Sequence, residues 1–322
     1  MVHLGYYNRP LSTVLFLTLL AILFFTQKKI ATLKKIPRPF YVALVIAIPL
    51  IISYPFLSRD FFNYMFDAKI VTVYHQNPYL LRALDFPADP WLRFMHWTHR
   101  TYPYGPVFLL ITLIPSFLSF GKLLLSILAF KATWTLFYLG TVFLLEKKYK
   151  AFALFFATSP LIIIEGLVNN HNDLIAICLT IIGLYFLFNS KKIKGYFGLL
   201  LSVGIKYFTL PFLLIQHKNR KINLFVFWLL VVGMGYIGVT QEMQPWYLLN
   251  LVPFLLVSEK MEGYFTVASL GVLLSYYPYI AIGDWTNVQA VVMKHIILLT
   301  TTIFVILAFV IRKTSLFRSD KV

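Results

Sequence analysis

Long apolar runs separated by short polar segments decide what this chain can fold into. Of its 322 residues, 59% are hydrophobic and 13% are charged, and its mean hydropathy is +0.77. A soluble domain of this length does not need so much apolar surface, whereas a bundle of membrane-spanning helices does. We therefore expect an all-α, polytopic transmembrane bundle that forms one membrane domain over residues 1–322. The apolar runs are Leu11–Thr26, Phe40–Leu57, Val107–Phe120, Leu123–Leu145, Ala151–Ile164, Leu174–Phe188, Tyr196–Ile215, Ile222–Thr240, Trp246–Val257, Tyr264–Ile282 and Val288–Ile311.

The basic residues are gathered in short clusters between these runs. The formal net charge of +17 could indicate nucleic-acid binding, but such clusters are typical of the cytoplasmic loops of membrane proteins, next to the lipids. We therefore expect membrane lipids, and no nucleic acid, as partners. The single cysteine, Cys178, lies in an apolar run, so no disulfide framework is expected. The clusters are Lys28, Lys29, Lys34, Lys35 and Arg38; Lys147, Lys148 and Lys150; Lys191, Lys192 and Lys194; Lys218, Arg220 and Lys221; and Arg312, Lys313 and Arg318.

The basic clusters restrict the path of the chain through the membrane. If every apolar run crossed once, the clusters could not all lie on one side. The conflict disappears if Val107–Phe120 enters and returns, and if Tyr196–Ile215 is a broken hairpin. Each run contains a reason to break, since the first includes Pro115 and the second includes Lys206 and Pro211.

This topology places the other polar segments together on the outer face. Carboxylates, amides and a histidine then gather outside, while lysine and arginine gather inside. We therefore expect a multi-pass protein of the cell membrane with its active site on the outer face. The outer segments are Ser58–Pro106, Glu165–Asp173, Gln241–Pro245 and Gly283–Asn287.

The longest of these segments, Ser58–Pro106, follows the second spanning helix and is predicted to be an outer loop of amphipathic helices. On a helix, Asp60, Asn63, Tyr64 and Asp67 fall at i, i+3, i+4 and i+7, so they share one face. One interpretation is chemistry at the bilayer surface. The other is an amphipathic helix that rests on the headgroups while its acids face water.

Asp60 is the candidate general base of this segment. Its neighbours are mostly aromatic, and desolvation by such side chains can raise a carboxyl pKa towards the range that suits proton abstraction. Asp67 could orient the substrate or help to hold a divalent cation. A cation site would need more oxygen ligands than these two, so no cofactor is assigned and a divalent cation stays open.

Two further groups interrupt apolar sequence. His171 and Asp173 end a dense polar cluster, NNHND, in which Asp173 could instead cap the helix that begins near Leu174. No paired His and Cys spacing accompanies the cluster, so a zinc site is not expected. Lys206 lies in the middle of an apolar run, where it either extends to the membrane surface or meets an anion such as a lipid phosphate.

The remaining candidates carry less specific signals. Arg59 could bind phosphate or lipid headgroups, and Lys131, Lys294 and His295 interrupt spanning runs without an assigned role. Several aromatic residues near the outer boundaries fit an interfacial belt, and one or two of them could stack against a sugar ring. These aromatic residues are Trp91, Trp97, Tyr102, Tyr104, Trp246 and Tyr247.

Three short segments of the outer loop resemble a known family. SRDFFNYMFD (58–67), NPY (77–79) and TYPYGP (101–106) are similar to the first outer loop of GT-C type membrane glycosyltransferases, most of all the polyprenyl-phosphate-mannose-dependent mannosyltransferase branch. Later landmarks follow in the order and spacing of that family, so the resemblance extends from about Ser58 to Tyr247. These landmarks are Ser159-Pro160, Glu165, His171-Asn172-Asp173, Lys206-Tyr207 and Pro245-Trp246-Tyr247.

The resemblance implies a site and a reaction. Such enzymes take a sugar from a polyprenyl phosphate, transfer it on the outer or lumenal side and generally invert the anomeric centre. By resemblance, Asp60 matches the base that deprotonates the acceptor, Lys206 meets the donor phosphate, and His171 and Asp173 line the same cavity. Asn63, Tyr64, Arg59, Asp67, Tyr104, Trp246 and Tyr247 complete the expected substrate-binding set.

The chain departs from the family pattern in three places. It has Tyr104-Gly105-Pro106 where many relatives have consecutive prolines, it lacks a strict DxD after the first core helix, and we expect no soluble C-terminal domain. The missing DxD leaves the use of a metal open. The missing domain disfavours relatives that act on protein acceptors.

We therefore expect a glycosyltransferase that moves a hexose, mannose by resemblance, from a polyprenyl-phosphate donor to a lipid-linked or glycan acceptor. The alternative is a transporter or flippase of lipid-linked sugars, in which charged residues and broken helices inside the membrane are also expected. A transporter predicts two related halves, and no internal repeat is present. A weaker alternative is a non-enzymatic assembly subunit. Motifs of nucleotide-driven transport and of the common hydrolases are absent.

Overall fold

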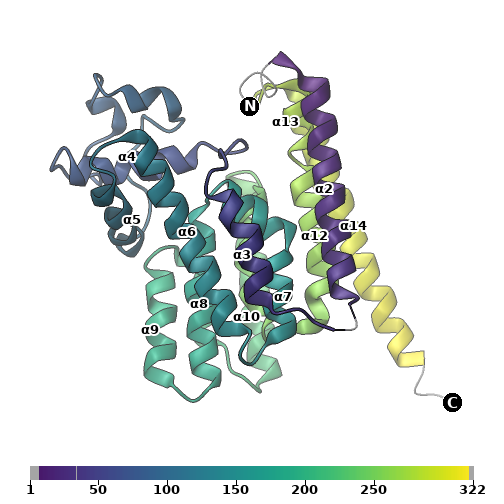
Figure 1. Cartoon of the computed structure of the whole chain (residues 1–322). Coiled ribbons are helices and arrows are strands. Elements are labelled where there is room, and N and C mark those ends of the chain that lie inside the picture. Colours follow the sequence, from purple (N-terminus) through teal and green to yellow (C-terminus); the bar gives the residue numbers. More distant parts are fainter. Residues whose placement is uncertain (1–6, 34, 319–322) are drawn as a thin grey trace. The chain divides into compact units, whose positions relative to one another are not determined.

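The structure, a computed structural model, describes residues 7–33 and 35–318, and these residues form helices with no strand among them (Figure 1). The all-α prediction is confirmed. The segment η3 is a π-helix and the other η segments are 3₁₀ helices. The elements are α2 (Arg9–Ala31), α3 (Pro39–Leu50), α4 (Asp60–Thr72), η1 (Ala83–Asp85), η2 (Pro90–Phe94), α5 (Pro106–Leu118), α6 (Leu123–Leu145), α7 (Lys150–Thr158), η3 (Ile162–Val168), α8 (Asn172–Phe188), α9 (Lys192–Val203), η4 (Tyr207–Leu214), α10 (Arg220–Thr240), η5 (Pro245–Leu251), α11 (Val252–Leu255), η6 (Glu259–Met261), α12 (Glu262–Leu274), α13 (Tyr277–Ile282) and α14 (Val288–Arg318).

Five segments among the described residues are long and apolar enough to cross a membrane. They are α2, α6, α10, the combined α12 and α13, and α14. A sixth is obtained if α7 and η3, which meet at a bend of 66°, are counted as one broken span. The chain is therefore a polytopic helical membrane protein, as the apolar runs predicted.

The contacts divide the chain into two compact units. Unit 1 comprises Met1–Lys34, Ser159–Leu161 and Ser258–Val322, and unit 2 comprises Lys35–Thr158 and Ile162–Val257. In unit 1, α2 packs on α13 and α12 packs on α14. Lys294 of α14 is buried, with its Nζ 5.7 Å from the centre of the Tyr279 ring, whereas His295 is exposed. The single domain over residues 1–322 stays a prediction.

Unit 2 contains all the residues that the sequence proposed for the site. Its α8 packs on α9 and α6, while α4 and α5 pack together at one end of this bundle (Figure 1). Glycines permit the close approach of α8 and α9, because a Cβ on Gly198 would lie 3.0 Å from the Cα of Gly183. The start of α4, the middle of α6 and the start of α8 carry residues of the site.

The predicted break in Tyr196–Ile215 is confirmed. Helix α9 ends at Val203, and after a turn the chain continues as η4, which packs back on α9. The turn pairs with the chain that enters α5: the N–H of Val107 donates to the carbonyl of Gly204 at 3.1 Å, and the N–H of Gly105 donates to that of Ile205 at 3.3 Å. A Cβ on Gly105 would lie 2.0 Å from the oxygen of Gly204, so only glycine fits at this junction.

A substitution at this junction should destabilise the protein. We expect Gly105→Ala to lower the stability by about 1–3 kcal/mol or more, because the added methyl group overlaps main-chain atoms that cannot move aside without breaking the two hydrogen bonds. Thermal unfolding in detergent measures the effect. Gly140→Ala in α6 is the matched control, since nothing lies within 4 Å of its Cβ. Equal unfolding temperatures for the two variants would contradict the prediction.

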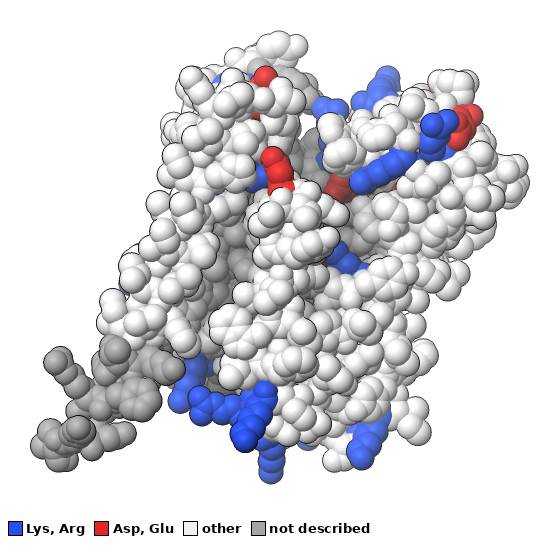
Figure 2. All heavy atoms as spheres, turned by 180° about the vertical axis from the view of Figure 1, so that it is seen from behind, with Lys and Arg blue, Asp and Glu red and all other residues white. Residues whose placement is uncertain are grey.

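The basic clusters of unit 2 lie at one end of its bundle. Arg38 before α3 pairs with Glu146 after α6 at 3.2 Å, and Lys148 after α6 donates to the side chain of Asn189 after α8. The rings of Phe188 and His217 lie 4.8 Å apart, which brings the start of α10 to the same end. In Figure 2, Lys and Arg are visible at the lower end and also in the upper part of the face in view, whereas Asp and Glu are visible only in the upper part.

The path of the chain in unit 2 therefore places its basic clusters at one end, as the charge pattern predicted. One part of the predicted path differs from the structure. The sequence predicted that Val107–Phe120 itself enters and returns. Instead, α5 is one continuous helix of 13 residues, and α6, which packs against it, makes the return. Pro115 lies inside α5 without ending it, so this part of the prediction is wrong.

Candidate active site

Helix α4 carries the two carboxylates that the sequence placed on one face, and it is buried along most of its length. All side chains from Phe61 to Ile70 are buried against neighbours that include α5 and α6. The interpretation of an amphipathic helix whose acids face water is therefore wrong, since Asp67 is buried and the Asp60 side chain is only 14% exposed. Asp60 begins the helix, where the positive end of the helix dipole favours a carboxylate.

Two residues fix the carboxylate of Asp60. The indole Nε1 of Trp97 donates to Oδ1 at 3.0 Å, and Nδ1 of His171 lies 3.7 Å from Oδ2. One turn along α4, the side chain of Asn63 donates to the main-chain carbonyl of Trp97 at 3.1 Å. This contact holds the segment that precedes α5 against the helix, and the carboxylate of Asp60 stays partly exposed.

The surroundings of Asp60 change its proton affinity in opposite directions. Burial raises the pKa of Asp60 above its ordinary value, and the charge of Arg100 and the hydrogen bond from Trp97 offset only part of this rise. A general base works best when its pKa lies near the working pH, so a raised carboxyl pKa suits proton abstraction.

His171 lies between the π-helix η3 and α8. Its Nε2 lies 3.3 Å from Oε2 of the buried Glu165, and its ring stacks on Trp246 with centroids 4.0 Å apart and planes inclined by 18°. The preceding Asn170 has a φ of 54°, in the left-handed region that asparagine enters more readily than most residues. π-helical turns and strained backbone occur often at functional sites.

Lys131 holds the end of η3 in place. It lies in the middle of α6, and its Nζ donates to the carbonyls of Leu167 at 3.0 Å and Val168 at 2.7 Å, and to the hydroxyl of Ser53 at 3.0 Å. The last carbonyls of a helical turn have no partner within it, and here a buried ammonium supplies one. A lysine for which the sequence gave no role therefore positions the chain that leads to His171.

A second charged group is built around Asp173 and Lys206. The Nζ of Lys206 lies 2.5 Å from Oδ1 of Asp173, and the side chain of Asn250 donates to the same oxygen at 2.7 Å. Asp173 is fully buried, whereas the Lys206 side chain is 22% exposed and lies 5.3 Å from the centre of the Tyr247 ring. Asp173 is therefore more than a helix cap, and Lys206 meets a carboxylate within the protein.

Asp67 faces a different pocket, which adjoins Asp60. Burial raises the pKa of Asp67 to about 8, and the charge of Arg100 offsets only part of this rise. At neutral pH the carboxyl group is therefore mostly protonated and a poor ligand for a hard cation. Among residues 7–33 and 35–318, no group of three His, Cys, Asp or Glu side chains has the geometry of a metal site. The pocket is lined by Asn63, Asp67, Trp97, Arg100, Thr101, Pro103 and Tyr104.

Some of the other predicted residues lie beside Asp60, and one lies outside the buried cluster. Tyr64 stacks on Trp134, with centroids 6.1 Å apart, and meets Tyr104 edge-on at 5.3 Å, so both tyrosines line the wall beside Asp60. Arg59 is exposed immediately before α4, outside the buried cluster.

Four residues of the site were not among the predicted site residues. Trp97 was interpreted as a belt residue, and Arg100 was not considered, because their neighbours depend on how the outer segment folds back on α4. Glu165 and Asn250 did carry a signal, since each is a single polar residue inside an otherwise apolar stretch. Their burial at 0% and 1% agrees with that signal.

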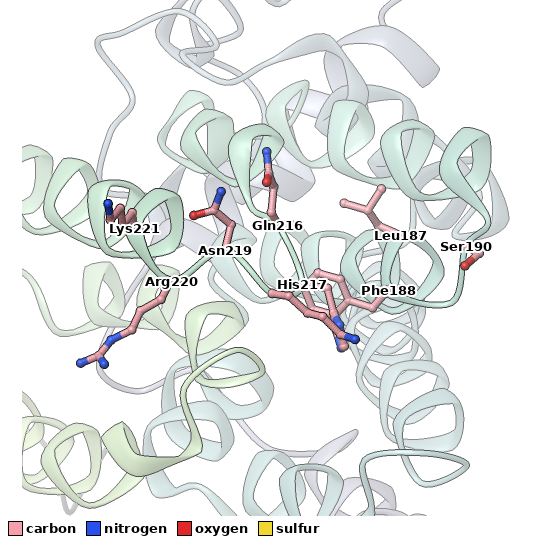
Figure 3. A pocket seen from close by; sticks show the side chains of 9 residues that line it. Leu187, Phe188, Ser190, Gln216, His217, Asn219, Arg220 and Lys221 are labelled. Carbon is pink, nitrogen blue, oxygen red and sulfur yellow. The ribbon is translucent and has the colours of Figure 1, made fainter.

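A pocket at the basic end of unit 2 is not part of this site (Figure 3). It is separated from Asp173 by the whole of α8, whose 17 residues span about 25 Å. It contains no carboxylate that could act as a base. Its lining residues are Leu187, Phe188, Ser190, Gln216, His217, Lys218, Asn219, Arg220 and Lys221.

Comparison with known proteins decides the family. Residues 11–217 match the family model of the MptA_B family, described as the alpha-(1->6)-mannopyranosyltransferase N-terminal domain, over more than half of the chain. The chain belongs to this family. No curated protein and no solved structure matched. The matched residues include Asp60, Glu165, His171 and Lys206, whereas Trp246 and Asn250 follow the matched range.

Family membership identifies the chain as a glycosyltransferase of a mannosyltransferase family. The prediction of a mannose-transferring membrane enzyme is therefore confirmed. The family points away from the alternatives of a transporter and of an assembly subunit. Its description names a sugar and a linkage, and the buried cluster around Asp60 offers the acids, amides and aromatic rings that such chemistry uses.

Proposed function

We propose that the protein transfers mannose from a polyprenyl-phosphate donor to a hydroxyl of a mannose-containing glycan or lipid-linked acceptor, on the outer face of the membrane and with inversion. Asp60 is the general base of this reaction. One observation carries the proposal: Asp60 is partly exposed, is hydrogen-bonded to Trp97, and meets His171 from a segment more than a hundred residues further along the chain.

The reaction is a single displacement at the anomeric carbon. The acceptor oxygen forms a bond to this carbon while its proton passes to Asp60. The bond between the anomeric carbon and the phosphate oxygen breaks, and its electron pair stays on the phosphate oxygen. Attack on the side opposite to the leaving group inverts the configuration. A base at the acceptor and a cation at the leaving group are the two requirements.

Lys206 is the proposed partner of the leaving phosphate. An ammonium group has three donors, and Asp173 accepts only one of them. The 22% exposure of the side chain leaves the remaining donors accessible. The buried carboxylate of Asp173 then orients Lys206, and the family resemblance supports the same role.

A defined donor and acceptor test the proposal. Purified protein in lipid vesicles is incubated with radiolabelled polyprenyl-phosphate mannose and a short α-(1→6)-linked mannose oligosaccharide, and in parallel with GDP-mannose as donor. We expect transfer from the lipid donor alone, and a product whose anomeric configuration is the inverse of the donor's. Transfer from GDP-mannose alone, or a retained configuration, would overturn the proposal.

A further inference from the structure

Three side chains of unit 2 form a line that begins at Asp60 and leads away from the surface. Oδ2 of Asp60 lies 3.7 Å from Nδ1 of His171, and Nε2 of His171 lies 3.3 Å from Oε2 of Glu165. The exposure of the side chains falls along the line, from 14% at Asp60 to 1% at His171 and 0% at Glu165. A histidine therefore lies between an accessible carboxylate and a buried one.

The surrounding structure holds the imidazole in this orientation. Trp246 stacks on the ring, and Nε1 of Trp134 donates to the carbonyl of His171 at 3.0 Å. The side chain of Asn169 donates to Oε2 of Glu165 at 3.1 Å, which fixes the second carboxylate. Within the part of the chain that the structure describes, neither ring nitrogen of His171 makes a regular hydrogen bond. Buried ring nitrogens of this kind ordinarily have partners, and a carboxyl oxygen lies 3.7 Å from Nδ1 and another 3.3 Å from Nε2.

The two distances favour one tautomer. Burial and the charge of Lys206 lower the pKa of His171 well below its ordinary value, so the resting ring is neutral. A neutral imidazole has one N–H and one lone pair. The shorter contact, to Glu165, fits an N–H on Nε2, which leaves the lone pair of Nδ1 facing Asp60.

We propose that His171 shares the proton that Asp60 removes from the acceptor, and that Glu165 stabilises the positive charge that this places on the imidazole. This inference rests on the proposed function of Asp60. The proton moves from the acceptor hydroxyl to Oδ2 of Asp60, where Nδ1 of His171 shares it, while Nε2–H faces Glu165. The proton leaves to water when the product departs, and Asp60 is then restored as a carboxylate. His171 and Glu165 act through Asp60 and do not contact the sugar.

The relay depends on the charged groups that face it from each neighbouring element. Carboxyl oxygens of Asp60 (α4) and Glu165 (η3) lie 3.7 and 3.3 Å from the two ring nitrogens, where a negative charge would favour the imidazolium. Lys206, between α9 and η4, opposes it, but Asp173 accepts a hydrogen bond from this lysine. Arg100, from the segment before α5, acts on Asp60 and is stacked on Trp97 at 4.5 Å. The carboxyl group nearest to the ring is that of Glu165, and its replacement should have the clearest effect.

The experiment compares the pH profiles of Glu165→Gln and the wild-type protein in the reconstituted mannose-transfer assay. Since Glu165 favours the bound proton, its neutral replacement lowers the proton affinity of the Asp60–His171 pair. The acid limb of kcat should therefore move to lower pH, by about 1–3 units. The plateau of kcat should fall while KM changes little. His171→Gln should lower kcat on the order of 10²-fold, the lower end of a general acid–base contribution.

Controls separate the relay from folding and from the proposed function. Tyr138→Phe removes a buried hydrogen bond of 2.7 Å to the carbonyl of Ala157, close in sequence to η3, and should lower the thermal stability without moving the acid limb. An acid limb of Glu165→Gln at the wild-type position would overturn the relay, even if the activity fell. Asp60→Asn tests the base itself: full activity of that variant would overturn the proposed function, independently of the result at Glu165.

Discussion

Replacing Asp60 by asparagine is expected to lower kcat for mannose transfer on the order of 10²–10⁴-fold, the contribution of a well-placed general base. The asparagine retains an oxygen that can accept the hydrogen bond from Trp97, which Asp60 accepts at 3.0 Å. The fold of the outer segment should therefore survive. The loss then reports on proton abstraction, because an amide oxygen cannot take up the proton at neutral pH. Initial rates with saturating polyprenyl-phosphate mannose measure it.

The matched control is Asp85→Asn. Asp85 belongs to the same outer segment, where it forms an exposed ion pair with Arg82 at 3.0 Å. It lies outside the buried cluster, so its replacement should leave transfer close to the wild-type rate. A similar loss in both variants would point to a general disturbance of the segment, and normal transfer by Asp60→Asn would remove Asp60 as the base.

The second large effect is expected at Lys69, within the same segment. Lys69 of α4 forms an ion pair with Asp89, and the exposures of the two side chains are 9% and 1%. The lysine also lies 4.0 Å from the centre of the Trp91 ring. Lys69→Met leaves the carboxylate of Asp89 buried with only Tyr74 and the Trp91 main chain as partners. Breaking a buried pair in this way costs about 3–5 kcal/mol.

The measurement is thermal or denaturant unfolding of the purified protein in detergent. Arg82→Met serves as the comparison, because its pair with Asp85 is also an ion pair of the outer segment but is exposed to water, where such pairs contribute little. The double variant Lys69→Met/Asp89→Asn removes the stranded charge and should recover part of the loss. Equal stability of Lys69→Met and Arg82→Met would show that burial does not strengthen the pair.

The sequence predicted the features that depend on local interactions, and it missed those that depend on contacts between distant parts of the chain. The run Leu123–Leu145 coincides with α6, because a long apolar stretch between polar ends defines a helix without reference to its neighbours. The shared face of Asp60 and Asp67 was predicted for the same reason, since only helical geometry is needed. Burial of that face was not predicted, because the covering segments follow α4 in the chain.

The candidate site shows the same division. Lys206 stood out in the sequence because a charge inside an apolar run is costly, but its pairing with Asp173 depends on how α8 and the end of α9 pack. Trp97 reaches Asp60 across 37 positions, and Asn250 reaches Asp173 across 77. No local pattern encodes such separations. Glu165 could have been found, since a single acid in the run IIIEGLV is as unusual as Lys206.

The main-chain junction between Gly105 and Ile205 has a mechanical consequence. Gly105 and Ile205 are each directly bonded to a residue of the site, since Tyr104 precedes Gly105 and Lys206 follows Ile205. The main-chain spacing between Tyr104 and Lys206 is therefore set by two hydrogen bonds of the backbone, and it does not depend on the side chains at these two positions. Substitutions at Tyr104 and Lys206 should change the chemistry beside Asp60 and Asp173 while the distance between their main chains stays constant.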